Sequence, residues 1–318
     1  MKKRKSTIVD IANKLGITPS AVSKALSDHP RISNETKVAV LDAVKELDYH
    51  PNPLATGLRK GKSGLIGILV PGIHYSFFAT AIKGAEEFLS KEGFSVIITQ
   101  SKDSFAHEKK QIEGLVRAQV EGVIASMAIE TKDTLYYKAL ARDIPLVLFD
   151  RTFDDEHVSS VIIDDFAGAV KAVDHLVEMG YRRIAHLSGY DHILPFKRRI
   201  DGYKSALAKN ELSFREEYLL PCAPNKDEGA KAMERLMALT EPPDAIFAAS
   251  DYLAFGAIRT IKSRGLKIPD DIGVVGFSNE EFSSQVSPDI TTIDQFSEIQ
   301  GASAAELLVE QIRYGKKG

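Results

Sequence analysis

Apolar residues lie along most of this chain in short runs of the kind that form buried β-strands. The first run, Leu65-Ile66-Gly67-Ile68-Leu69-Val70, is apolar at nearly every position, as is typical of a strand covered by helices on both faces of a parallel sheet. Similar runs follow at residues 95–99, 122–126, 144–149, 161–163, 184–187, 245–249 and 274–277. Segments with helical spacing separate them, including residues 78–91 and 297–314. This regular alternation predicts an α/β protein with parallel sheets.

The α/β region contains a faint internal repeat. Ile66 precedes Ile82-Lys83-Gly84 by the same spacing as Ile184 precedes Ile200-Asp201-Gly202, and the two segments are 118 residues apart. We therefore expect two similar lobes. The carboxyl ends of the strands in such lobes form the usual binding edge for small molecules.

The first 50 residues show a different pattern, that of short amphipathic helices. A first helix is predicted by the apolar residues Ile8, Ile11, Ala12 and Leu15, and Gly16 is suited to end it. Thr18 is suited to cap a second helix, with Pro19 at its first position. Helix, tight turn and short helix make up a helix-turn-helix unit.

A third helix is predicted after the potential cap Ser33. We expect its apolar residues to face inward, namely Val40, Leu41, Val44 and Leu47. On the second helix, one face carries only hydroxyl groups and one ammonium group, from Ser20, Ser23, Lys24 and Ser27. Such a face can lie against the phosphates of a nucleic-acid groove. The alternative is a small three-helix bundle with a solvated polar face.

The distribution of charge favours a nucleic-acid partner. Of the 41 basic and 44 acidic residues, 12 and 6 lie in residues 1–62, which leaves 29 and 38 for the rest of the chain. A basic head joined to an acidic body points to a polyanion that binds the head. The single cysteine, Cys222, excludes an internal disulfide framework and suits a reducing cytoplasm. The sequence contains neither a signal-peptide core nor the roughly 20 apolar residues of a membrane span.

The head resembles that of the lactose-repressor (LacI/GalR) family of bacterial transcription regulators. The resemblance rests on Ile8-Val9-Asp10-Ile11-Ala12, on Gly16 to Leu26, on Ile32-Ser33-Asn34-Glu35-Thr36 and on Glu46 to Asn52. It implies a helix-turn-helix domain over residues 1–50, a hinge helix and linker over 51–64, and a two-lobed body like that of periplasmic binding proteins over 65–318. We expect lobe one at about 65–157 and 294–318 and lobe two at about 158–293, with crossings near 155–160 and 280–295.

The resemblance also implies a homodimeric repressor that binds a near-palindromic double-stranded DNA operator. We expect base contacts from Pro19, Ser20 and Lys24, and phosphate contacts from Thr7, Ser23, Asn34 and Thr36. In the hinge, Leu58 matches the leucine that the family inserts into the minor groove, and Ala55 matches the small residue near it. Thr56 stands where the family usually has Arg, and Gly57 weakens an isolated helix by about 1 kcal/mol relative to Ala.

A small-molecule effector is expected between the lobes. The resemblance assigns it the residues Tyr75, Phe77, Phe78, Ser126, Asp150, Arg151, Arg199, Ser250 and Ser278. We expect Phe78 to pack in the core as well, and Asp251 to cap the helix that follows it. We expect the effector to be a sugar or a sugar phosphate. Because Ser278 replaces an acidic residue of the family pattern while Arg151 and Arg199 are retained, a sugar phosphate is somewhat favoured over a simple neutral sugar.

Other classes of function fit the sequence less well. It contains no Gly-x-Gly-x-x-Gly after the first strand, no P-loop and no His-x-x-x-His, so neither a cofactor, a metal nor a catalytic residue is predicted. The paired acids Asp154-Asp155 and Asp164-Asp165 are weak candidates for a dyad because neighbours in a strand point to opposite faces. A cytoplasmic solute-binding module without DNA function remains the alternative.

The family pattern continues past Gly315-Lys316-Lys317-Gly318 into a segment that pairs with the sheet. This chain ends there. We expect either a truncated chain or a first lobe without that segment.

Overall fold

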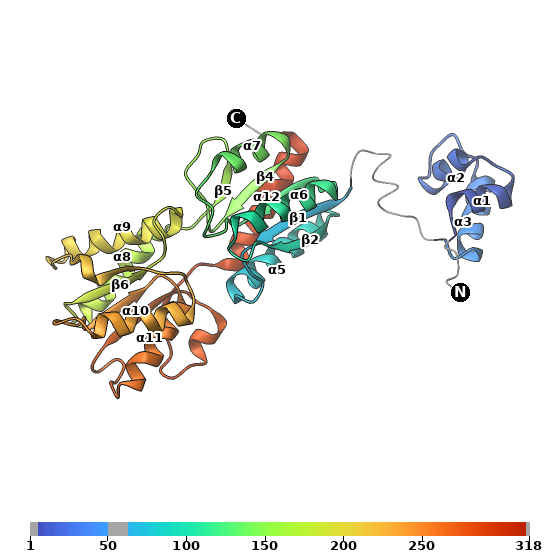
Figure 1. Cartoon of the computed structure of the whole chain (residues 1–318). Coiled ribbons are helices and arrows are strands. Elements are labelled where there is room, and N and C mark those ends of the chain that lie inside the picture. The colour runs from blue at the N-terminus through green and yellow to red at the C-terminus, as the bar shows by residue number, and fades with distance from the viewer. Residues whose placement is uncertain (1–5, 50–62, 316–318) are drawn as a thin grey trace. The chain divides into compact units, whose positions relative to one another are not determined.

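The computed structural model describes residues 6–49 and 63–315, and the chain forms two compact units, Met1–Ser63 and Gly64–Gly318 (Figure 1). The first unit is called the head and the second the body. None of the helices in the described ranges is long and apolar enough to cross a membrane.

The described part of the head contains the predicted helices, with ends set by local hydrogen bonds. They are α1 (Ile8–Leu15), α2 (Pro19–Leu26) and α3 (Asn34–Glu46). Helix α1 begins with a capping box, in which the Thr7 amide donates to Asp10 Oδ2 at 2.7 Å. It ends at Gly16, whose φ of 64° is the left-handed conformation that glycine adopts without strain. The Ala21 amide donates to Thr18 Oγ1 at 3.2 Å, which confirms the predicted cap.

One of the residues that we expected inside the head is outside. Val40 is fully buried, but Leu41 is 51% exposed. The inward positions of α3 follow one helical face through Val40, Ala43 and Val44. Because Leu41 is rotated by about 100° from Val40 around the helix axis, it lies beside this face rather than on it.

The body consists of two lobes, each with one five-stranded parallel sheet. The first sheet has the order β2-β1-β3-β4-β5 and the second the order β10-β9-β8-β6-β7. The strands of the first are β1 (Leu65–Val70), β2 (Ser95–Gln100), β3 (Gly122–Ala125), β4 (Leu146–Phe149) and β5 (Ser159–Val161). The strands of the second are β6 (Ile184–Ser188), β7 (Leu219–Pro221), β8 (Ala245–Ala248), β9 (Gly273–Ser278) and β10 (Thr291–Asp294).

Helices cover both faces of each sheet. In the first lobe they are α5 (Ser76–Lys91), α6 (Phe105–Arg117), α7 (Leu135–Asp143) and α12 (Ser297–Tyr314). In the second lobe they are α8 (Asp165–Glu178), α9 (Leu194–Lys209), α10 (Lys226–Met237) and α11 (Asp251–Ser263), with short 3₁₀ turns η1 (Glu216–Tyr218) and η2 (Glu281–Ser284). Helices α5 and α12 pack on one face of the first sheet, and α6 and α7 on the other. The second lobe repeats this layout with α8 and α9 opposite α10 and α11.

The boundary between the lobes differs from the sequence prediction. Residues 161–163 were expected to begin the second sheet, but Ser159–Val161 form β5, which pairs with β4 through Val161 opposite Phe149. This strand is half-buried at all three positions, so it lacks the apolar pattern of the inner strands and could not be recognised from it. In the described residues the chain passes to the second lobe after β5 and returns after β10 (Figure 1).

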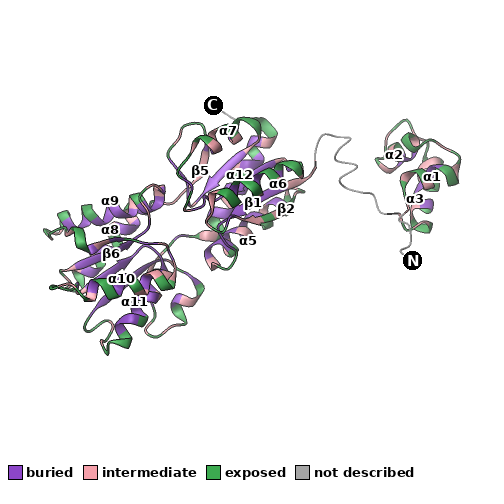
Figure 2. Cartoon of the chain, in the orientation of Figure 1, coloured by how far each residue is buried: buried purple, intermediate pink, exposed green. Residues whose placement is uncertain are grey.

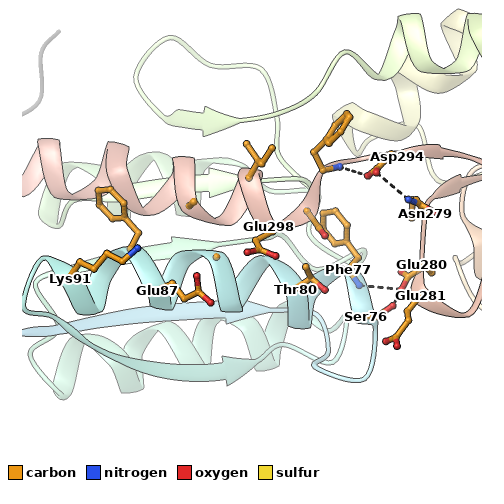
Figure 3. Close-up of a pocket in the computed structure, with 17 residues that line it drawn as sticks. Ser76, Phe77, Thr80, Glu87, Lys91, Asn279, Glu280, Glu281, Asp294 and Glu298 are labelled. Carbon is orange, nitrogen blue, oxygen red and sulfur yellow. Dashed lines mark hydrogen bonds between the residues drawn. The ribbon is translucent and has the colours of Figure 1, made fainter.

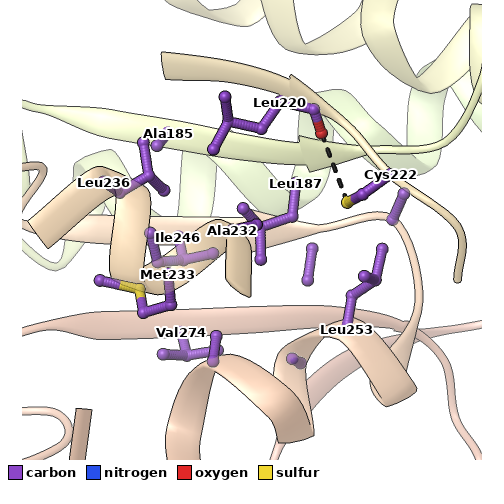
Figure 4. Packing of buried hydrophobic residues seen from close by; sticks show 14 of the residues in the cluster. Ala185, Leu187, Leu220, Cys222, Ala232, Met233, Leu236, Ile246, Leu253 and Val274 are labelled. Carbon is purple, nitrogen blue, oxygen red and sulfur yellow. Dashed lines mark hydrogen bonds between the residues drawn. The ribbon is translucent and has the colours of Figure 1, made fainter. Parts of the chain in front are cut away.

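The inner strands are buried on both faces, and their side chains contribute to the hydrophobic core on each side of the sheet (Figure 2). In the second lobe, Leu187 and Ile246 of neighbouring strands pack against Met233 and Leu236 of α10 (Figure 4). The internal repeat has a structural meaning. A Cβ on Gly84 of α5 would lie 2.1 Å from the carbonyl oxygen of Glu298, and one on Gly202 of α9 would lie 2.5 Å from that of Phe166. Each repeat therefore places a glycine where a second helix packs closely.

Candidate functional site

A small cavity lies between the lobes, where strands of both sheets end. Its open space is about 50 Å³. Of the nine residues predicted to bind an effector, eight line it: Tyr75, Phe77, Phe78, Asp150, Arg151, Arg199, Ser250 and Ser278. The sequence analysis did not identify the remaining lining residues, Phe196, Pro224, Ala249, Tyr252, Glu280 and Gln295. The ninth predicted residue, Ser126, is fully buried behind the lining, where its Oγ accepts the Arg151 amide at 3.4 Å.

Arg199 is fixed by the second lobe from three directions. Its Nε donates to Asp165 Oδ1 at 2.8 Å, and its Nη1 donates to the carbonyl oxygen of Ala249 at 2.7 Å. The guanidinium also lies 3.7 Å from the ring centre of Phe277. Among the described residues, Nη2 has no aligned acceptor, although it is 2.7 Å from Asp165 Oδ1. The guanidinium is thus rigidly placed, and only two of its five N–H groups donate to an acceptor in hydrogen bonds among the described residues.

Arg151 is the corresponding cation of the first lobe. Its Nη1 donates to Asp103, and its guanidinium lies 5.6 Å from the ring centre of Phe78. Neither Asp103 nor Asp165 lines the cavity. Both arginines are therefore ion-paired with acids that lie behind them, so they bring little net positive charge to the cleft.

Two carboxyl groups face the same cavity. Burial raises the pKa of Asp150, and burial likewise raises the pKa of Glu280. Gln295 Nε2 lies 3.5 Å from Asp150 Oδ1, which makes it a long, weak donor. Sequence reasoning missed Glu280 because it lies two positions beyond Ser278, the position at which an acid was expected. The adjacent pair Glu280-Glu281 was the only signal for it.

The backbone is strained where the strands end at the cavity. Asp150 has a φ of 54°, Ser278 of 132° and Asn279 of 55°, conformations that L-residues rarely adopt. Such strain persists where the surroundings hold it, and it clusters at binding sites. Here Ser278 Oγ donates to Gln295 Oε1 at 2.7 Å, and Asn279 Nδ2 donates to Asp294 Oδ2 at 3.1 Å.

The prediction that Asp251 caps the helix after β8 is wrong. The helix α11 is capped by Ser250, whose Oγ accepts the Leu253 amide at 3.3 Å. Asp251 is fully buried and instead accepts Thr292 Oγ1 at 2.6 Å and the Glu280 amide at 2.8 Å. Asp251 thus supplies the acceptor that buried donors of the loop after β9 need, whereas the beginning of α11 already has a cap from Ser250. Ser250 nevertheless lines the cavity as expected.

Aromatic rings close one side of the cavity. Tyr75 of the first lobe meets Tyr252 of the second edge to face, with ring centres 5.1 Å apart. Phe78 packs against Phe149 and is 3% exposed, so it belongs to the core as well as to the lining. Aromatic faces beside hydroxyl and carboxyl groups are the usual surroundings of a sugar or a base.

A second, open groove of about 740 Å³ adjoins the cavity along α5 and α12 (Figure 3). It shares Phe77, Ser278 and Glu280 with the cavity, and its far part is lined by Glu87, Lys91 and other exposed side chains. Lys83 links the two helices by donating to Glu298 at 3.0 Å. The groove thus runs between α5 and α12 of the first lobe, and it is also lined by residues of the second lobe, namely Ser278, Asn279, Glu280, Glu281 and Asp294.

In the head, most of the residues predicted to contact DNA lie at or near the beginnings of helices, whereas Ser23 and Lys24 lie in the second half of α2. Pro19 and Ser20 lie in the first turn of α2 and, like Lys24, are exposed; Ser23 is half-buried. Asn34 begins α3 and is exposed. Thr7 and Thr36 already take part in capping contacts, with Asp10 and Ser33 respectively. Helix N-termini carry a partial positive charge that suits phosphate.

Ala55 and Leu58 of the hinge lie outside the described residues. Within residues 6–49 and 63–315, no group of three or more His, Cys, Asp or Glu side chains could hold a metal ion.

Comparison with known proteins covers nearly the whole chain. Residues 7–52 match the bacterial regulatory proteins of the lacI family, and residues 63–318 match the periplasmic binding proteins and sugar binding domain of the LacI family. The probable HTH-type transcriptional repressor ExuR of Bacillus subtilis is 31% identical over 96% of this chain and 91% of its own length. The ribose operon repressor of Halalkalibacterium halodurans is 32% identical over 96% and 90%. Among solved structures, the transcriptional regulator CelR-cellobiose complex is 27% identical over 98% of this chain and 94% of its own, with a TM-score of 0.74.

Proposed function

Since the chain belongs to the lacI family of bacterial regulatory proteins, which are DNA-binding repressors with an effector-binding body, we propose that it represses transcription as a homodimer at a near-palindromic operator. Two heads related by a two-fold axis would occupy two half-sites of the DNA. The protein would act in the bacterial cytoplasm, where the operator is. A solute-binding module without DNA function would not account for the match of residues 7–52 to the regulator family.

The proposed base contacts follow from three exposed residues of α2. Ser20 and Lys24 can hydrogen-bond base edges in the major groove, and Pro19 can contact a thymine methyl group. Phosphate contacts are proposed for Thr7, Ser23, Asn34 and Thr36. Three of these, Thr7, Asn34 and Thr36, belong to the capped beginnings of α1 and α3, whose partial positive charge supports them. In the hinge, Leu58 would enter the minor groove beside Ala55.

The proposed effector is a sugar bound between the lobes. The observation that carries this proposal is the set of side chains at the cavity: aromatic rings, the carboxyl groups of Asp150 and Glu280, and arginines held by acids of their own. Hydroxyl groups can donate to the carboxylates and accept from the guanidinium of Arg199, which lines the cavity. A phosphate would meet two carboxylates with little net positive charge to offset them, so the cavity favours a neutral sugar over a sugar phosphate. Relatives named for a ribose operon and for a complex with cellobiose agree with this class.

Effector and operator would be coupled through the angle between the lobes. A coupling free energy of about 1–3 kcal/mol is typical of such linked sites. Fluorescence anisotropy with operator DNA, selected from a random double-stranded library, measures it as the change in operator affinity on adding effector. Unchanged affinity with a bound effector would contradict the coupling.

The effector is found by thermal unfolding with a panel of matched pairs, such as ribose and ribose 5-phosphate or glucose and glucose 6-phosphate. A ligand at 100 times its Kd stabilises the folded chain by about 2.7 kcal/mol. We expect the neutral member of a pair to raise Tm. A shift only with the phosphorylated member would contradict the proposed class. A Ser278→Ala variant that loses the shift would locate the ligand at the cavity.

A further inference from the structure

The first turn of α5 is capped from the other lobe. Its N-cap residue, Tyr75, makes no side-chain cap bond among the described residues. The Phe77 amide instead donates to Oε2 of Glu280 at 3.2 Å, and Ser76 Oγ donates to the same oxygen (Figure 3). Ser76 and Glu280 are 204 positions apart in the chain. A carboxylate at a helix N-terminus is favoured by the helix dipole and by charge-assisted hydrogen bonds.

The second lobe holds Glu280 rigidly for this contact. The Glu280 amide donates to Asp251 Oδ2 at 2.8 Å, and Asp251 is fully buried beneath it. Thr292 Oγ1 donates to the other carboxylate oxygen of Asp251 at 2.6 Å. A Cβ on Gly276 would lie 2.1 Å from that oxygen, so the strand leaves just enough space for Asp251. The carboxylate of Glu280 is therefore presented by a fixed loop and is not a loosely placed surface charge.

The contact lies at the mouth of the cavity, since Phe77 and Glu280 both line it. The open space of about 50 Å³ is small beside the roughly 300 Å³ or more of typical ligand pockets. A ligand of sugar size can enter only if the lobes separate or the lining moves. The bonds from Ser76 and Phe77 to Glu280 join the two lobes at this place, so they oppose that separation.

We propose that Glu280 is a latch between the lobes, which holds them together through the first turn of α5 and yields when the cleft admits its effector. The latch itself does not depend on what the effector is. Its regulatory meaning rests on the proposed function, because a regulator transmits a change in the angle between the lobes to its DNA-binding heads. The bonds of Glu280 then raise the free energy needed to open the cleft, and they lower the apparent affinity for the effector by that amount.

The test measures the distance between the lobes in the whole chain without effector or DNA. Spin labels are placed on exposed positions of α6 and α9 by Lys110→Cys and Ser205→Cys, in a Cys222→Ala background, and labelled chains are diluted with unlabelled ones. Pulsed electron-electron double resonance then gives the distribution of distances between the two spin labels. We expect one narrow distribution for the parent chain and a shift to a broader distribution for Glu280→Ala.

Glu281→Ala is the matched control, because Glu281 is the neighbouring acid but is exposed on η2. It should leave the distribution unchanged. A folded Glu280→Ala chain with the parent distribution would overturn the proposal, as would an equal shift in Glu281→Ala. If Glu280→Ala does not fold, the variants Ser76→Ala and Glu280→Gln test the latch instead. Each removes part of the bonding, and each should broaden the distribution; no broadening in either would refute the latch.

Discussion

Arg199 and Asp165 form an ion pair that is almost wholly removed from solvent, with side-chain exposures of 3% and 2%. Removing one member of such a pair leaves a buried charge without its partner, which costs about 3–5 kcal/mol. We therefore expect Asp165→Ala to lower the free energy of unfolding by about this amount. It should also weaken effector binding, because Arg199 loses the acceptor that orients it. Urea-induced unfolding measures the first effect and ligand titration the second.

Asp164→Ala is the matched control for this change. Asp164 is the preceding acid, but it caps α8 by accepting the Ala167 amide at 2.9 Å. Loss of a cap costs about 1 kcal/mol and should leave effector binding unchanged. Equal losses of stability in the two variants would mean that the buried pair contributes no more than a helix cap.

Gly301 is needed where α12 crosses α5. A Cβ at this position would lie 1.8 Å from the carbonyl oxygen of Ala81, which belongs to the backbone of α5 and has no side chain that could give way. Gly301→Ala must therefore push the helices apart, and overpacking of this kind costs about 3 kcal/mol or more. The change is measured as a fall in the urea midpoint at constant slope.

Gly114→Ala, in contrast, should raise the free energy of unfolding. Gly114 is a glycine of the exposed helix α6, and a Cβ there would meet only the tip of Arg117, at 3.9 Å. Alanine is favoured over glycine inside a helix by about 0.5–1 kcal/mol. A stabilising Gly301→Ala, or a strongly destabilising Gly114→Ala, would show that helix packing in the solution state differs from that described.

Much of the architecture was readable from the sequence because the inner strands are apolar on both faces. The run at 65–70 has no other stable place than between two layers of helices. The short strands β7 and β10 were missed, and β5 was assigned to the wrong sheet. These strands have three or four residues, and β5 and β10 lack fully buried positions. These segments are strands because they pair with a neighbouring strand, and the local pattern of residues in a single sequence does not reveal that pairing.

The site was predicted to a similar degree and for a similar reason. The family resemblance named all eight predicted lining residues, and seven of them follow strands or begin helices, as the topology requires. Arg199, in the second turn of α9, was assigned by the resemblance alone. Glu280, Tyr252 and Gln295 reach the cavity only because the two lobes meet. Likewise, the acids behind Arg151 and Arg199 are distant in sequence and change the charge that the arginines bring to the cleft. Residue types alone suggested an anionic effector, and the ion pairs favour the neutral one.

His186 should make the body sensitive to acid. Its ring is stacked on Phe247 and fully buried, and burial lowers the pKa of His186 to about 3. In the unfolded chain the pKa of histidine is about 6.5. Between these values the unfolded state binds a proton that the folded state refuses, so stability falls as the pH is lowered. The slope from this group approaches about 1.4 kcal/mol per pH unit below pH 6.5.

His186→Phe should remove that contribution while keeping an aromatic ring against Phe247. The measurement is the free energy of unfolding by urea at several pH values between 4 and 7.5, with His107→Phe on the exposed face of α6 as control. The difference between His186→Phe and the parent chain should grow in favour of the variant as the pH falls. A difference that is constant with pH would show that His186 binds a proton as readily in the folded chain as in the unfolded chain.

Lys24 should contribute sequence preference as well as charge to operator binding. It is an exposed residue in the last turn of α2, four positions after Ser20. The matched control, Lys45, is an exposed lysine in the last turn of α3. Loss of a base contact costs about 1–3 kcal/mol and relaxes the preference at one base pair, whereas loss of a phosphate contact weakens all sequences alike. We therefore expect Lys24→Ala to weaken binding to the selected operator by about 5- to 150-fold and to flatten the penalty at one position of each half-site, with Lys45→Ala close to the parent chain. Anisotropy titrations against operators with single base-pair changes measure both quantities. If Lys24→Ala weakens binding to all DNA sequences equally, Lys24 contacts phosphates and not bases. If Lys24→Ala and Lys45→Ala weaken binding equally, Lys24 contributes only through net charge.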